Sequence, residues 1–165
     1  LLIKLICALF LSTCVTAEPK PDPHSLKAMT ASVIKEFKVY FPEVYIPKKQ
    51  FVFFEYVPTK MVADVDTGKT RPNHGVCKFD WRAPFNNKIY IYHKRWIKER
   101  NLWKKRKVLM HEFGHCLLLM KHAKNRSIMD TRLSTPKADG SNWKKLMKEF
   151  KARFEKGGRH VIFGG

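Results

Sequence analysis

Acidic residues are scarce in this chain, which has 14 of them against 33 lysines and arginines, for a formal net charge of +19 at pH 7. A surplus of this size favours anionic partners such as nucleic acid, acidic cell-wall material or a membrane surface. The sequence contains no zinc-finger, RRM or helix-turn-helix pattern, however, and its basic residues are spread over several predicted elements. The composition therefore predicts affinity for an anionic surface or polymer without predicting a nucleic-acid reading module.

A long apolar run and an internal repeat are also missing. The most apolar stretch, residues 1–17, is too short to span a bilayer comfortably. It carries one lysine and ends on small residues before Glu18, which predicts a signal peptide and export to the periplasm or the exterior. A short buried helix and lipid attachment at Cys14 are the alternatives. Residues 18–25 are expected to form a proline-rich extended leader, and residues 26–165 a single domain.

Cysteine is rare, and only Cys77 and Cys116 lie outside the predicted signal peptide. In an oxidising compartment these two residues could pair. A sequence alone cannot place their Cα atoms within bonding range, so burial as free thiols stays open.

The most informative stretch that is present is His111-Glu112-Phe113-Gly114-His115, an HExxH motif. On a helix, residues four apart share one face, so the two imidazoles can hold one Zn²⁺ at roughly 2.0–2.1 Å. Glu112 would then reach the open side of the metal and take a proton from its water. The motif predicts a catalytic zinc site.

His122 is the candidate third ligand, seven residues after His115. If the helix simply continued, His122 would lie about 10.5 Å further along its axis, too far for one ion. A shared ion therefore requires the helix to end between Cys116 and Lys121, where no glycine is available and a non-glycine residue would take a positive φ. The alternative ligands are Asp130 and Glu149.

Together with Ser127-Ile128-Met129 downstream, this pattern resembles the metzincin zinc peptidases, which read HExxHxxGxxH followed by a methionine turn. It is more similar still to small phage and bacterial metallopeptidases that read roughly HELGHCLLGxxH and then SIM. The third histidine comes one residue late here, and a Leu118-Leu119-Met120 run replaces the usual glycine. The resemblance implies Zn²⁺ on the three histidines, Glu112 as general base, and Met129 as an apolar floor beneath them.

Periodicity and turn residues predict the other elements. Trp96–Asn101 is expected to be a short helix or turn, Lys104–Lys107 to face solvent, and His74 to be a solvated loop residue. In chain order we expect a helix over Leu26–Tyr40 with Ser25 as N-cap, strands Phe51–Tyr56 and Met61–Val65, a loop over 66–75, strands Gly75–Asp80 and Lys88–His93, a helix over Leu102–Leu119, a loop over Leu133–Gly140, and a final basic helix that Asn142 caps and Gly157 ends.

This order of elements supports an α/β or α+β fold. The resemblance adds a twisted, mostly parallel sheet packed on helices, with an antiparallel edge strand, as in a minimal metzincin-like catalytic domain. It places that edge at Gly75, Val76, Cys77 and Lys78, where an extended peptide could add as a further strand. A central strand, paired on both sides, is the alternative. Lys78 and Arg82 would favour acidic side chains in the substrate.

We therefore expect an exported zinc-dependent endopeptidase acting on a protein or peptide substrate. The alternative is a basic, non-catalytic zinc protein that binds nucleic acid, cell wall or a membrane surface. The final helix, with its lysine-rich face, is expected to pack on the body of the domain, although a similar helix could lie on an anionic membrane.

Overall fold

A computed structural model describes residues 24–56, 61–63, 70–80, 82–83, 86–123, 127–130 and 140–157. The expected signal peptide, the lipidation site at Cys14 and most of the leader lie outside the described residues. Among the described helices, none is both long and apolar enough to cross a membrane.

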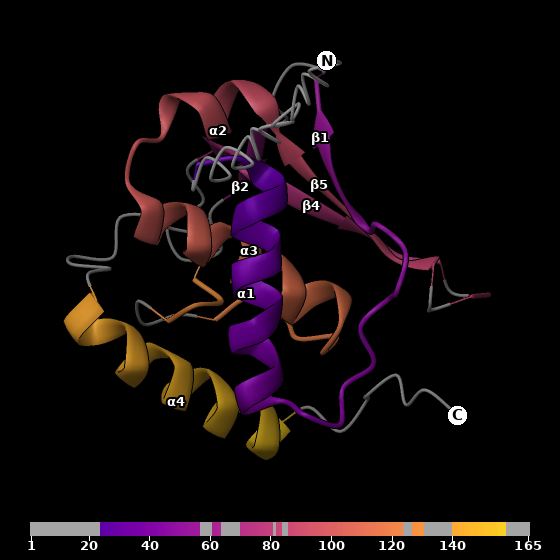
Figure 1. Cartoon of the computed structure of the whole chain (residues 1–165), viewed down its shortest axis with the longest axis vertical. Coiled ribbons are helices and arrows are strands. Elements are labelled where there is room, and N and C mark those ends of the chain that lie inside the picture. Colours follow the sequence, from indigo (N-terminus) through magenta and orange to yellow (C-terminus); the bar gives the residue numbers. More distant parts are fainter. Residues whose placement is uncertain are drawn as a thin grey trace, which may run out of the picture.

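The described chain is a mixed α/β structure, as predicted (Figure 1). Its elements are α1 (Leu26–Tyr40), β1 (Val52–Glu55), β2 (Met61–Ala63), β3 (Thr70–Pro72), β4 (Gly75–Lys78), β5 (Lys88–Tyr92), α2 (His93–Lys98), α3 (Leu102–Cys116) and α4 (Gly140–Gly157).

The main sheet has the strand order β1-β5-β4. β1 runs parallel to β5, and β4 runs antiparallel to it. Within the described sheet, β4 is therefore an antiparallel edge strand, as expected for this segment. The sheet is mixed rather than mostly parallel, because one of its two pairings is antiparallel. β2 and β3 form a separate antiparallel pair.

The long helix α3 is central. It packs against β4 and β5 and also against α1, which in turn contacts α4; Figure 1 shows α1 crossing in front of α3. The helices meet through aromatic side chains: the rings of Phe37 and Phe113 lie edge to face at 5.5 Å, and those of Phe41 and Phe150 at 5.4 Å. Each aromatic pair of this kind contributes about 0.5–1.5 kcal/mol in addition to the free energy gained by burying its apolar surface.

The central position of α3 overturns one prediction. Lys105 and Lys107 were expected to face solvent but are only 4% and 0% exposed. Because α3 has neighbours on more than one side, its lysine run cannot all reach water. The Lys105 ammonium lies 4.8 Å from the centre of the Trp96 ring, so the charge is held against an aromatic face.

Several boundaries also differ from prediction. β3 forms in a stretch predicted to be a loop because it pairs with β2, a contact that composition does not reveal. α2 begins at His93, directly after β5, rather than at Trp96. α4 begins at Gly140, so Asn142 lies inside the helix and is not its cap. The Ser25 cap of α1 is confirmed, since Ser25 Oγ accepts from the Ala28 N–H at 3.2 Å.

β4 ends at Lys78, earlier than expected. The Asp80 N–H donates to Asn87 Oδ1 at 2.9 Å, and the Asp80 carboxylate accepts from the Arg82 and Ala83 N–H groups. These bonds turn the chain away from the sheet two residues before the predicted end of the strand.

Candidate metal centre

His111 and His115 lie one turn apart on α3, and their Nε2 atoms are 3.1 Å apart. Each ring is oriented through its other nitrogen. His111 Nδ1 lies 2.9 Å from the Ile128 carbonyl oxygen, and His115 Nδ1 lies 2.7 Å from that of Met120. A carbonyl oxygen only accepts, so each Nδ1 must carry the hydrogen. The two Nε2 lone pairs are therefore left facing each other.

His122 returns to these histidines because α3 ends at Cys116. Leu119 then takes a positive φ of 52°, and the Met120 N–H donates to the Gly114 carbonyl at 2.9 Å. The prediction that the helix stops before His122 without a glycine is confirmed. The left-handed conformation at Leu119 costs about 1–2 kcal/mol, which binding of a metal would offset.

The three histidines fit a metal ion. One ligand atom from each lies within 4.8 Å of the others, which makes this group able to hold an ion. Tetrahedral zinc with bonds of roughly 2.0–2.1 Å needs ligand atoms about 3.3 Å apart, close to what His111 and His115 already show. His122 is exposed, so a rotation of its side chain can close the remaining gap. A cation would also relieve the repulsion between the two facing lone pairs.

Neither alternative ligand belongs to this group among the described residues. Asp130 is buried, at 3% exposure. Burial lowers the pKa of His122, and the nearby Asp130 carboxylate opposes that shift. Asp130 therefore acts on His122 electrostatically. Glu149 is exposed on α4.

Glu112 is buried beside the histidines, with 3% of its surface exposed, and burial raises its pKa to about 8. Its carboxylate lies against Gly75 of β4: a Cβ atom added at Gly75 would be 2.9 Å from both Glu112 Cγ and Oε1. Sequence reasoning missed this contact, because nothing in the spacing of the two residues pairs strand with helix.

Met129 is fully buried under the same turn of α3. A Cβ atom added at Gly114, between the two ligands, would overlap the Met129 sulfur and lie 3.2 Å from Phe150. The Ala123 N–H donates to the Met129 carbonyl at 3.0 Å, which fixes the chain just after His122. Met129 thus packs beneath the turn of α3 that carries His111 and His115.

Cys77 and Cys116 form a disulfide, with their Cα atoms 5.5 Å apart. This settles the question that the sequence left open. The bond joins β4 to the last residue of α3, one position after His115.

Only two of the four residues predicted to bind a peptide, Gly75 to Lys78, have backbone groups that point away from β5. The Tyr92 N–H donates to the His74 carbonyl at 3.1 Å. In an antiparallel pair such bonded positions alternate, so Val76 and Lys78 bond to β5. Only Gly75 and Cys77 direct their N–H and C=O groups away from it.

Lys78 gives little support for acidic selectivity. Its ammonium lies 3.8 Å from the Glu55 carboxylate and 4.2 Å from the centre of the Tyr90 ring. The Lys78 charge is therefore already paired with groups of the neighbouring strands. Because the Lys78 side chain is 60% exposed, this ion pair contributes little to stability.

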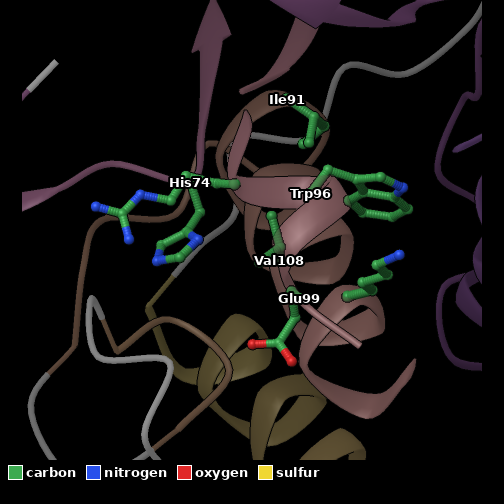
Figure 2. Close-up of a pocket in the computed structure, with 7 residues that line it drawn as sticks. His74, Ile91, Trp96, Glu99 and Val108 are labelled. Carbon is green, nitrogen blue, oxygen red and sulfur yellow. The ribbon is translucent and has the colours of Figure 1, made fainter. Parts of the chain in front are cut away.

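His74 is not the solvated loop residue expected. Figure 2 shows its ring in a small pocket with Ile91, Trp96, Glu99 and Val108. Burial, followed by the charge of Arg95, lowers the pKa of His74 to about 4. The pocket holds about 10 Å³, at the lower limit for one water molecule. A space of this size cannot admit a peptide substrate.

Comparison with known protein families, curated proteins and solved structures found no match to this chain.

Proposed function

We propose that this chain is a zinc-dependent endopeptidase with a metzincin-like site. The observation that carries the proposal is the convergence of His111, His115 and His122 beside a buried Glu112. The end of α3 before His122 and the position of Met129 beneath Gly114 support the metzincin comparison.

In this proposal the three histidines would hold the ion through ring nitrogens, and the Ile128 and Met120 carbonyls fix the rings of His111 and His115. Zinc bound there would polarise the scissile carbonyl and lower the pKa of a bound water molecule toward 7. Glu112 would act as the general base that takes a proton from water and as the acid that returns it to the leaving amine. Burial brings the Glu112 pKa to about 8, and a nearby cation would lower it, so the carboxylate can exchange a proton near neutral pH.

The substrate is proposed to lie along β4, because this edge is adjacent to Glu112. Gly75 and Cys77 offer the backbone groups that would pair with an extended peptide. Replacing successive substrate amides by N-methyl amides should abolish hydrolysis only at alternate positions. Equal loss at every position would contradict pairing with β4.

The competing function is a basic, non-catalytic zinc protein that binds an anionic polymer. A structural zinc normally has four protein ligands, whereas the group found among the described residues has three, with a carboxylic acid next to it. This favours catalysis. We also propose export, and the disulfide supports it because such bonds persist in oxidising compartments.

Zinc analysis combined with hydrolysis of a peptide library, with and without a chelator, tests the proposal. Glu112→Ala should abolish hydrolysis and keep the metal. Glu149→Ala, which changes an exposed glutamate of α4, is the matched control and should affect neither. If the zinc-loaded protein cleaves no peptide, or Glu112→Ala cleaves as well as the unaltered chain, the proposed function is wrong.

A further inference from the structure

On the side of β4 that faces α3, two contacts with the helix lie next to proposed site residues. Gly75 lies against Glu112, and Cys77 is bonded to Cys116. The contacts are two residues apart on the strand and four apart on the helix. Two strand residues span about 6.8 Å and four helical residues about 6 Å, so the strand and helix advance together.

At the first contact, the strand has no side chain where Glu112 needs space. A Cβ atom at Gly75 would lie 2.9 Å from Glu112 Cγ and 3.0 Å from Cδ. Because Cγ is close to the helix backbone, moving only the carboxylate end cannot relieve this overlap. The whole side chain would have to rotate, within a site where Glu112 is only 3% exposed.

At the second contact, the disulfide prevents β4 from sliding along α3 or moving away from it. Without that bond, β4 is held along its own length by β5 alone among the described strands. A shift of the strand would carry Gly75 away from Glu112 and place a residue with a side chain against the carboxylate.

We propose that Gly75 is a positioning residue for Glu112, held in place by the Cys77–Cys116 disulfide. This role rests on the proposed peptidase function, because the strand would orient the general base. It also makes β4 serve two purposes at once: its outward backbone groups receive the peptide, and its inward face sets the base.

Three glycine-to-alanine variants of the zinc-loaded protein separate this role from general packing. Gly75→Ala should lower kcat on the order of 10- to 100-fold, while KM and zinc content stay near those of the unaltered chain. Gly114→Ala should instead weaken zinc binding, because the added methyl group meets Met129 and Phe150. Gly157→Ala is the matched control and should change none of these, since nothing lies within 4 Å of an added Cβ atom there.

Coupling to Glu112 supplies a readout that a merely structural role would not move. Glu112→Ala removes Cγ and the carboxylate, which are the atoms that an added Cβ at Gly75 would meet. Gly75→Ala should therefore change the visible spectrum of the Co²⁺-loaded protein in the unaltered background and leave it unchanged in the Glu112→Ala background. Equal changes in both backgrounds, or loss of zinc in proportion to loss of hydrolysis, would overturn the positioning role.

A readout independent of hydrolysis keeps the two proposals apart. The visible spectrum of the Co²⁺-loaded protein reports the surroundings of the ion. It should change in Gly75→Ala and not in Gly157→Ala. If no peptide is cleaved but this difference appears, the peptidase proposal fails and the Gly75–Glu112 relation stands. If both spectra equal that of the unaltered chain, Gly75 does not position Glu112.

Discussion

His111 and His115 each commit Nδ1 to a backbone carbonyl, and this decides what the two side chains can do. With the hydrogens on Nδ1, both Nε2 atoms are acceptors at 3.1 Å, an arrangement that a cation stabilises. Burial, followed for His111 by the charge of His115, lowers the two pKa values to about 3 and about 4. The neutral, metal-binding form is thus the stable one near pH 7.

His122 can be tested as the third ligand by removal. His122→Ala should weaken zinc binding by more than about 100-fold, because two protein ligands make a poor site. Equilibrium dialysis against zinc measures the change, and His74→Ala is the matched control, since His74 lies outside the group. Unchanged zinc binding in His122→Ala would move the third ligand elsewhere, with Asp130→Asn examined next.

The same pKa shifts predict how acid affects the metal-free protein. His111 and His115 titrate near 3 and 4 when folded but near 6.5 when unfolded, so below pH 6.5 the unfolded state binds more protons. Each histidine should then lower the free energy of unfolding by about 1.4 kcal/mol per pH unit down to its folded pKa. Glu112 opposes one of them between pH 4.5 and 8, where the folded state holds its proton.

Urea unfolding of chelator-treated protein at pH 7, 6 and 5 measures this net loss. His111→Ala should make the dependence on pH shallower. With zinc present the fall should be steeper, because protonation also releases the metal. Stability that stays constant from pH 7 to 5 in the metal-free protein would contradict the assigned shifts.

At the scale of elements, the end of α3 controls whether the third histidine reaches the site. Leu119 has a φ of 52°, a left-handed conformation that glycine adopts far more readily than leucine. Leu119→Gly should keep zinc binding, since glycine adopts that conformation without strain. Leu119→Pro should abolish it, because proline fixes φ near −65°. Zinc analysis decides the matter, and a Leu119→Pro variant that binds zinc normally would show that this turn is not required.

The sequence could predict those features that depend only on residues close together in the chain. The HExxH helix and its break before His122 follow from spacing and helix geometry, whereas the position of Met129 was expected only from the family resemblance. The Cys77–Cys116 bond, the burial of Lys107 and the Gly75–Glu112 contact could not be predicted. Each depends on how a strand or helix packs on α3 from far along the sequence, which composition and periodicity do not encode.

The molecule as a whole carries a large excess of positive charge, with 33 basic against 14 acidic residues. The described part of α4 buries Trp143, Met147 and Phe150 against the body of the domain. The prediction that the apolar face of α4 packs on the domain is therefore confirmed, and the lysine-rich face points to solvent. Exposed basic residues of α4 are Lys144, Lys145, Lys148, Arg153 and Lys156. A field of this kind attracts anionic partners at long range without requiring any one lysine at the site.

The positive charge of the molecule predicts a difference in salt dependence between substrates. For an acidic peptide, kcat/KM should fall on the order of tenfold as ionic strength rises from about 0.02 to about 0.5 M, because added salt screens the attraction. A neutral peptide of the same length should change little. The effect should lie mainly in kcat/KM at low substrate, since steering raises the rate of encounter and leaves the chemical step unchanged. Lys78→Ala should preserve most of it, as that charge is shared with Glu55 and only one of 33 basic residues is removed. An equal fall for acidic and neutral peptides would mean that salt acts on the site or the fold, and that the charge of the molecule does not select its substrates.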